Sequence, residues 1–384
     1  MAERAQRTSP SPRGAARNTG TAASNGRQRR AIVAPVLVRV MRGDILEAEH
    51  RGHVVEVDAS GRVVRSIGDP DAVVTLRSTV KPLGLVALVE AGGIEAFGLT
   101  SAELAIMASS HSGEDLHVRT LHDVFRRARI SQSALACGVE HAPLDALTAA
   151  RLARDGERPG PIRHNCSGNH AALLLLARLG DSPLDGYWEA DHPAMRAFSA
   201  AVGRAFGTPP DRLVTAIDNC GILTYAFPLR SVAASYALLA APDAIEASDP
   251  RASLAPAFRT IGEAMMGNPE LVAGTRDRLD TVLMKAAPGR LVSKGGAEAL
   301  RAIGLVGGGG HAPSGIAIKI VDGDGADRAG RAAAVETLAQ VNALDDRTVR
   351  ELGRYHRPQT LDSHGRVAAE ARPSFELAPV GELV

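Results

Sequence analysis

Extended, β-branched runs stand near both ends of this chain, and a long helix-like stretch separates them. Near the start, "PVLVRV" is followed by "HVVEVDASGRVVRSIG", in which the turn residues "DASG" predict a hairpin or meander. "GIAIKIVDG" and "GRVAAEARPSF" are the late extended runs. Between them, "HPAMRAFSAAVGRAFG" and "LAPAFRTIGEAMMGNPELV" carry apolar residues at three- and four-residue spacing, which is typical of helices. The pattern predicts an α+β fold, an antiparallel sheet with adjacent terminal strands and a cover of helices.

The domain organisation follows from the same pattern. We expect a single globular unit over residues 31–378, with a helical lobe over roughly 95–290, because no Pro- or Ser-rich linker marks a boundary. Within it, Ser101 is the expected N-cap of the helix "AELAIMAS". "GEDLHVRTLHDVFRRARI" and "AGRAAAVETLAQVNAL" are two further predicted helices.

Charge excludes some classes of partner. The chain has 44 basic and 43 acidic residues, so its balance favours a small neutral partner over nucleic acid. Residues 1–30 carry seven arginines and one acid, Glu3, and predict a disordered tail; a basic arm that contacts nucleic acid is the alternative. No apolar run resembles a secretory signal or a membrane span, so we expect a cytoplasmic protein without a membrane partner.

The stretch "TLRSTVKPLGL" places Ser78 three residues before Lys81. Pro82 is tolerated only in the first turn of a helix, so Ser78 is expected at a helix start, with its hydroxyl and the Lys81 amine on one face. A serine becomes a nucleophile when a base takes its proton, and a lysine is such a base if its pKa is lowered. Ser-x-x-Lys also arises often by chance, so the pair needs support from elsewhere in the chain.

Support comes from the order of three short blocks. Penicillin-recognising serine enzymes use Ser-x-x-Lys, Ser-x-Asn and Lys-[Thr/Ser]-Gly in this order. Here "STVK" is followed by "SGN" at 167–169 and "KGG" at 294–296, although the setting of the last, "KGGAEALRAIG", favours a helix over a strand. Ser110 in the polar turn "ASSHSGE" and Lys294 form a second candidate pair, but the turn is equally well read as a helix cap, and Ser109, Ser110 and Ser112 cannot be ranked.

Nine blocks together resemble one family, the rhizobial-type or class 3 L-asparaginases, also called asparaginase II. They lie between about residues 37 and 375 and include "RSTVKP", "ASSHSGED", "HNCSGNHAALL", "DNCGILTYAFPL", "NPELVAGT" and "KGGAEAL". The resemblance implies a fold like that of the serine β-lactamases and glutaminases, and hydrolysis of L-asparagine to L-aspartate and ammonia. It assigns catalysis to Ser78 as nucleophile, to Lys81 as its partner, and to Ser110 and Lys294.

The resemblance also implies a metal site. The family binds metal through the cysteine and lysine of "CSGKH" and the cysteine of "DGC", which match Cys166, Asn169 and Cys220. Asparagine replaces the lysine here, and an amide is a weaker zinc ligand than an amine, whereas two thiolates remain good ones. Zn²⁺ is therefore the expected cofactor, with His164 or His170 as further candidate ligands and a buried, unreactive cysteine pair as the alternative. With three cysteines in all, we expect no disulfide framework.

Position beside the motifs suggests Arg77, His111, Glu114 and Asp218 as partners of the substrate's charged groups. Three other functions stay open: a glutaminase, a penicillin-recognising hydrolase, and a silent relative that only binds metal or an amino acid. The P-loop, dinucleotide and His-Glu-x-x-His motifs do not occur. A homodimer is the usual state of such enzymes.

Overall fold

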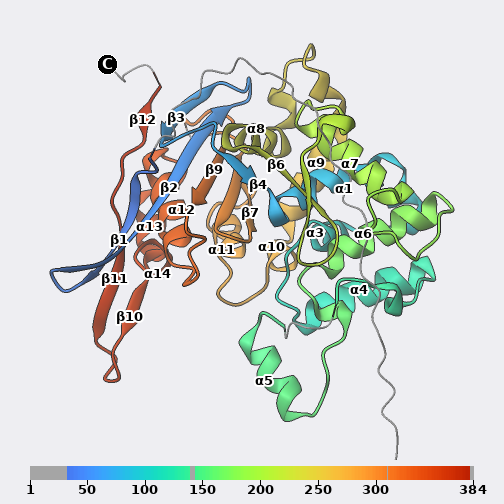
Figure 1. The fold of residues 1–384 in the computed structure, drawn as a ribbon, viewed down its shortest axis with the longest axis horizontal. Coiled ribbons are helices and arrows are strands. Elements are labelled where there is room, and N and C mark those ends of the chain that lie inside the picture. The colour runs from blue at the N-terminus through green and yellow to red at the C-terminus, as the bar shows by residue number, and fades with distance from the viewer. Residues whose placement is uncertain (1–32, 139–142, 309, 381–384) are drawn as a thin grey trace, which may run out of the picture. The chain divides into compact units, whose positions relative to one another are not determined.

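Strands from both ends of the chain lie side by side in the computed structural model, which describes residues 33–138, 143–308 and 310–380. Within these residues, a nine-stranded sheet has the order β10-β11-β1-β2-β9-β8-β7, and β3 pairs with both β2 and β12. β1 (Val36–Arg42) is antiparallel to β11 (Val367–Pro373), with Val38 opposite Pro373; Figure 1 draws them in blue and red. The predicted α+β fold with adjacent terminal strands is confirmed.

The remaining strands complete two sheets. In the large sheet they are β2 Ile45–Asp58, β3 Val63–Ile67, β7 Leu291–Gly296, β8 Leu300–Leu305, β9 Ser314–Ile320, β10 Gln359–Leu361 and β12 Ala378–Pro379. The small sheet has the order β4-β6-β5 and consists of β4 Val73–Thr75, β6 Leu223–Pro228 and β5 Thr215–Ile217. The hairpin predicted around "DASG" is the β2–β3 pair.

Helices occupy most of the chain between β4 and β7. They are α1 Lys81–Glu90, α2 Gly93–Phe97, α3 Ser101–Met107, α4 Asp115–Ala128, α5 Ala146–Arg154, α6 Ser167–Leu179, α7 Pro193–Ala205, α8 Leu229–Ala240, α9 Ala255–Gly267, α10 Pro269–Val272 and α11 Leu279–Ala286. After β9 follow α12 Ala329–Gln340, α13 Asp346–Glu351 and α14 Gly353–His356. Short 3₁₀ turns are η1 Arg77–Val80, η2 Gln132–Ala134, η3 Pro161–Arg163, η4 Pro210–Arg212, η5 Pro242–Ala244 and η6 Pro250–Leu254.

Helices cover both faces of the large sheet. Three consecutive residues of β9, Ile316, Ala317 and Ile318, are fully buried, and successive side chains of a strand point to opposite faces. α8 packs on β2, β8 and β9, whereas α12 packs on β1, β9 and β11. A Cβ atom at Gly315 of β9 would lie 1.8 Å from the Ala233 carbonyl oxygen of α8, so only glycine allows this close approach.

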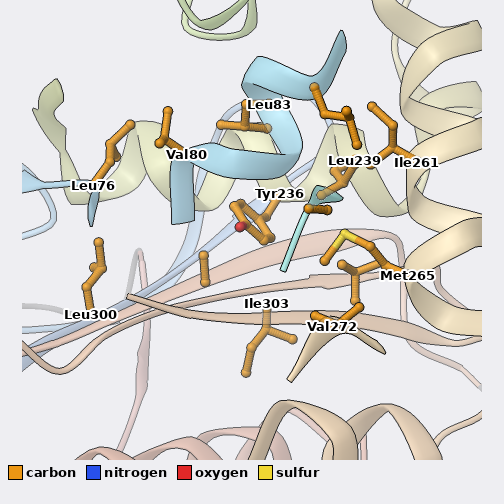
Figure 2. Close-up of a cluster of buried hydrophobic side chains, with 14 of the residues drawn as sticks. Leu76, Val80, Leu83, Tyr236, Leu239, Ile261, Met265, Val272, Leu300 and Ile303 are labelled. Atoms are coloured by element: carbon orange, nitrogen blue, oxygen red, sulfur yellow. The ribbon is translucent and has the colours of Figure 1, made fainter. Parts of the chain in front are cut away.

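A buried apolar cluster fixes the start of α1 against the sheet (Figure 2). Leu76, Val80 and Leu83 lie within or beside η1 and are at most 1% exposed. The Tyr236 hydroxyl of α8 donates a hydrogen bond of 2.8 Å to the Thr79 carbonyl inside η1. Because this turn contains Ser78, packing and one buried hydrogen bond together hold the position of Ser78.

The N-cap of α3 differs from the prediction by one residue. Thr100, not Ser101, caps the helix, since its hydroxyl accepts from the Glu103 amide at 3.3 Å. The Glu103 carboxylate accepts from the Thr100 amide at 2.8 Å and completes a capping box. Thr100 is preferred because Glu103 stands three residues after it, which the reciprocal bond requires.

The setting of Lys294 was predicted wrongly as a helix. Lys294 lies in β7, opposite Ala302 of β8. Glu298 and Ala299, in the connecting turn, have positive φ angles of 59° and 51°, as a tight hairpin turn requires. Local sequence favours a helix here, but pairing with β8 overrides that preference.

The described residues from Val33 onward form one compact unit. The predicted tail, residues 1–30, lies outside the described residues. A membrane-spanning helix, long and apolar enough to cross a bilayer, does not occur among the residues that the structure describes.

Candidate active site

Lys81 is a buried amine at the first position of α1. Its side chain is 1% exposed, and its Nζ donates to the Ser109 carbonyl at 2.8 Å and contacts the Ser110 Oγ at 3.0 Å. The Cys166 Sγ is a third neighbour at 3.3 Å. In the described part of the chain, no hydrogen bond joins Lys81 to the Ser78 hydroxyl. The predicted pairing of the Ser78 hydroxyl with the Lys81 amine therefore stays a prediction: Ser78 lies in η1, just before α1, and is not a hydrogen-bond partner of Lys81 among the described residues.

Ser110 lies between two lysines. It follows α3 in a loop whose backbone is held by a hydrogen bond from the Ser110 amide to the Val272 carbonyl at 3.0 Å. Its Oγ is 3.0 Å from the Lys81 Nζ and 2.9 Å from the Lys294 Nζ. Ser112, by contrast, donates to the Ala273 carbonyl. The Ser109 Oγ is buried without a partner among the described residues, so Ser110 is the serine of this turn whose hydroxyl contacts both lysines.

Lys294 is fully buried on β7, where its Nζ also donates to the Gly295 carbonyl at 2.7 Å. Burial, and next the charge of nearby Lys81, lower the pKa of Lys294 to about 7. Near neutral pH its amine is therefore present in both protonation states. In the neutral state the amine accepts a proton from the Ser110 hydroxyl, and in the charged state it donates one.

Ser78 and Ser110 line one cavity of about 230 Å³, here named the serine cavity. The other lining residues are Asn165, Asp277, Arg278, Leu279, Asp280, Gly295, Gly296, Ala297, Arg301, Asp327 and Arg331. Among the described residues, none is hydrogen-bonded to the Ser78 hydroxyl, so this oxygen is available to a ligand. Drug-sized ligands occupy pockets of about 300–1,000 Å³, so this smaller volume favours a small molecule.

Arg278 presents a cation to the serine cavity. Its guanidinium donates to the Ser110 carbonyl at 2.9 Å. Among the described residues, it forms no ion pair within 4 Å, in contrast to Arg301 and Arg331 in the same wall. A guanidinium has five donors in a planar fork that matches a carboxylate, so Arg278 is suited to bind one.

Asp280 holds the strand that carries Lys294. Its carboxylate accepts from the Ser293 hydroxyl at 2.7 Å and from the Gly295 amide at 2.9 Å, and it pairs with Arg301. Burial raises the pKa of Asp280, but the charges of Arg301 and Lys294 outweigh this and keep the pKa below its ordinary value. Asp280 is therefore ionised and already fully engaged.

The four residues predicted to bind substrate lie outside the described lining of the serine cavity. Arg77 pairs with Asp218 at 2.7 Å. The His111 Nε2 is 2.8 Å from the Ser167 hydroxyl, and the Glu114 carboxylate accepts from the Thr275 amide at 2.8 Å. Arg77 precedes Ser78 with a positive φ of 46°, a strained conformation for a residue with a side chain. These contacts support the loops around the cavity.

The two candidate metal-binding cysteines meet behind Lys81. Cys166 precedes α6 and Cys220 lies in the turn between β5 and β6, and their side chains are hydrogen-bonded to each other. The bond from Cys220, and next the charge of Lys81, lower the pKa of Cys166 well below its ordinary value against the effect of burial. The same bond and burial raise the pKa of Cys220. Of the two thiols, Cys166 thus has the lower pKa.

Asn169 supplies a test of whether these residues fit a zinc ion. Its side chain is 0% exposed, and neither its oxygen nor its nitrogen has a hydrogen-bond partner in the described structure. An unpartnered buried amide is costly, and the first turn of α6 places it beside Cys166. No group of three or more His, Cys, Asp or Glu residues suited to a metal occurs among the described residues. Two thiol sulfurs and one amide oxygen are the donors that these three residues offer, whereas a structural zinc ion takes four.

The two candidate histidines have other contacts. The His164 Nδ1 accepts from the Cys166 amide at 3.0 Å. The His170 Nδ1 is 2.5 Å from the Tyr187 hydroxyl, while its Nε2 is buried without a partner among the described residues. Burial lowers the pKa of His170 to about 3, so this ring is neutral.

Sequence reasoning missed Asn165, Arg278, Asp280 and Arg301 in the wall of the cavity. A signal was present for two of them. Arg278 and Asp280 lie three and five residues after the block "NPELVAGT", at the start of α11, where a charged residue is unexpected in a buried first turn. Asn165 lies in the block "HNCSGNHAALL", just before α6, and Arg301 lies on β8, and neither local stretch indicates that these residues line a cavity.

Comparison with known proteins places the chain in a family. Two solved structures resemble it weakly: Mglu (14% identity, 76% of this chain and 67% of that chain, TM-score 0.36) and a probable glutaminase from Bacillus subtilis complexed with 6-diazo-5-oxo-L-norleucine (11% identity, 76% and 85%, TM-score 0.34). Comparison with curated proteins gave no significant match. The sequence model described as L-asparaginase II matches residues 38–373. Because this match spans most of the chain, the protein belongs to the L-asparaginase II family and is an amidohydrolase with a small-molecule substrate.

Proposed function

We propose that this protein hydrolyses the side-chain amide of L-asparagine to L-aspartate and ammonia. The observation that carries the proposal is the Ser110 hydroxyl, which lies between two buried lysine amines in the wall of a cavity that also contains Ser78. An amide resists attack because a negative oxygen must develop and a poor leaving group must depart. A nucleophile and a proton relay at one small cavity meet both demands.

Ser78 is the proposed nucleophile. Its hydroxyl is unengaged within the described structure, lines the cavity and belongs to a turn fixed by the core, so it can approach an amide carbon without breaking a hydrogen bond. Lys81 follows on the same helix face and accepts the hydroxyl proton as the new C–O bond forms. The product of this step is an acyl ester on Ser78, which water then hydrolyses to aspartate.

Ser110 is the proposed relay between the lysines. Above pH about 7 Lys294 is neutral, so the two amines together lack one proton. A Ser110 hydroxyl that donates to Lys294 and accepts from Lys81 can pass a proton from Lys81 to Lys294. Lys81 thereby becomes neutral and able to take the Ser78 proton. The relay then returns a proton through Ser110 to the departing nitrogen, which leaves as ammonia.

The charges of the cavity suit an amino acid. The substrate's α-carboxylate would pair with Arg278, whose guanidinium has no ion-pair partner within 4 Å among the described residues. Asp277 and Asp327 line the same cavity with side chains that are 63% and 68% exposed, and either could receive the α-amine. The volume of about 230 Å³ favours such a ligand over a β-lactam.

We expect Arg278→Met to weaken substrate binding. Loss of a bidentate charge-assisted pair costs about 1.5–3 kcal/mol, which corresponds to a KM raised by about 10- to 100-fold. Initial-rate kinetics with L-asparagine measure this change. Arg347→Met is the matched control, since Arg347 is 82% exposed on α13. An unchanged KM in Arg278→Met would exclude Arg278 as the carboxylate partner.

Substrate choice is decided by parallel assays. Ammonia release from L-asparagine and L-glutamine, and cleavage of a chromogenic β-lactam, should be measured on the same preparation. We expect the highest kcat/KM for L-asparagine. A higher value for glutamine would make the protein a glutaminase, cleavage of the β-lactam a penicillin-recognising hydrolase, and binding of asparagine without ammonia a silent relative.

We also propose that Cys166, Cys220 and Asn169 hold a zinc ion. A bound zinc would stabilise the thiolates and fix the start of α6 against the β5–β6 turn.

We expect about one zinc per chain in the wild type after incubation with zinc and dialysis, and less than about a tenth of that in Cys220→Ala. Metal analysis and the melting temperature with and without chelator measure this. Cys137→Ala, a buried cysteine whose Sγ donates to the Pro161 carbonyl, is the control. Equal zinc in wild type and Cys220→Ala would contradict the site.

A further inference from the structure

A second cavity, of about 720 Å³, adjoins the serine cavity and is here named the arginine cavity. It is bounded by the start of α12, by α14 and by the segment that leads into β10. Four arginines line it: Arg328, Arg331, Arg354 and Arg357. Asp277, Asp327 and Arg331 also line the serine cavity, so the two cavities share one wall.

The carboxylates of the arginine cavity are already engaged. Arg331 pairs with Asp277 at 2.8 Å and with Asp327 at 2.6 Å. Glu370 pairs with Arg372 at 2.9 Å and lies 3.8 Å from Arg357. These three carboxylates therefore neutralise Arg331 and, in part, Arg357.

Arg328 and Arg354 have no carboxylate within ion-pair distance among the described residues. The Arg354 guanidinium lies 4.6 Å above the Tyr355 ring and donates to its hydroxyl. Arg328 donates from its Nε to the His50 Nε2 at 3.2 Å. Each guanidinium has five N–H donors, so the stacking and the single bonds orient the two forks and leave most of their donors unused.

We propose that the arginine cavity binds a small dianion, either a dicarboxylate or a phosphate. Two uncompensated guanidinium groups in one concave site favour a ligand with two negative charges, and each fork matches a carboxylate or a phosphate. The volume lies within the range of about 300–1,000 Å³ that is usual for ligand sites. Gln359 and Thr360 add neutral polar groups to the same wall.

The shared wall couples the two cavities. A dianion that also engages Arg331 competes with Asp277 and Asp327, and a carboxylate released in this way faces the serine cavity. The dianion thereby changes the affinity of the serine cavity for a ligand with an amine, and the effect is reciprocal. Dianion binding itself requires no turnover, so the proposal stands or fails separately from the proposed function.

Titration calorimetry with succinate and with inorganic phosphate tests the proposal. All proteins should carry Arg278→Met, which removes the free guanidinium of the serine cavity. Binding of the anion in the serine cavity is then not counted with binding in the arginine cavity. We expect one site per chain, with an affinity at least about tenfold lower in R328Q/R354Q, since charge-assisted hydrogen bonds are lost. R62Q/R347Q is the control with the same change in charge, because these arginines are 80% and 82% exposed.

The outcomes separate the possibilities. Tighter binding of succinate identifies a dicarboxylate ligand, and tighter binding of phosphate identifies a phosphate ligand. Absence of binding for both probes up to about 10 mM, well above common ligand affinities, would overturn the proposal. An equal loss of affinity in R62Q/R347Q would do the same, because it would trace the effect to net charge. R354Q alone, at an exposed position, should also weaken binding, and its melting temperature verifies folding.

Discussion

Ser78→Ala is expected to lower kcat for ammonia release from L-asparagine by at least about 10⁴-fold, as loss of a serine nucleophile does in other hydrolases. Among the residues that the structure describes, Ser78 combines a place in the cavity wall with a hydroxyl that has no hydrogen-bond partner. No acyl ester can form without its oxygen, and the lysine relay alone cannot replace it. Steady-state ammonia assays with saturating substrate measure the loss.

Ser253→Ala is the control, because Ser253 is an exposed serine in η6, outside the described lining of the serine cavity. Acid quench during turnover, followed by peptide mapping, locates the acyl group. We expect the aspartyl mass on the peptide that contains Ser78. An aspartyl ester on Ser110 would exchange the roles assigned to Ser78 and Ser110. Full turnover by Ser78→Ala would remove Ser78 from the role of nucleophile.

Lys294→Met is expected to lower kcat by about 10²–10⁴-fold, the usual contribution of one general acid–base group. It also changes the pH profile. The neutral amine of Lys294 is present above pH about 7, so wild-type kcat/KM should rise as the pH increases through that value. Asp280, whose pKa lies below its ordinary value, stays ionised across this range, and Lys81 faces the same hydroxyl, so the rising limb belongs to the lysine pair. In Lys294→Met this limb should disappear from the profile near pH 7.

Lys294→Arg separates charge from proton transfer. Arginine keeps the positive charge but does not lose its proton in proteins, so we expect this variant to be as impaired as Lys294→Met. Lys285→Met is the control, since Lys285 is 54% exposed and pairs with Glu270. Survival of the rising limb near pH 7 in either Lys294 variant would show that Lys294 is not the group responsible.

Local patterns predicted much of the fold. The hairpin of β2 and β3, the long helices α4 and α12 and the late strands β9 and β11 follow from periodicity and turn residues, which act over a few positions. The adjacency of β1 and β11 followed from one further argument, that strands at both ends around a helical middle tend to share a sheet. The error at Lys294 arose where a strand is formed by pairing with β8 against the local preference.

The candidate site, too, could be predicted only in part from the sequence. Sequence blocks predicted Ser78, Lys81, Ser110 and Lys294 as catalytic candidates, because these lie in short motifs whose residues are close along the chain. Their partners could not be predicted. Lys81 contacts Ser110 and Cys166, which are 29 and 85 residues away, and the order of residues contains no measure of such distances.

The sequence by itself determined the fold class, the family and the residue types that can perform the chemistry, since periodicity and motifs are local properties of the chain. Only the tertiary structure decided that both lysines converge on Ser110, that Arg278 lines the same cavity and that Arg328 and Arg354 lack carboxylate partners among the described residues. The physical reason is that burial, pKa and ion pairing depend on which distant segments pack together.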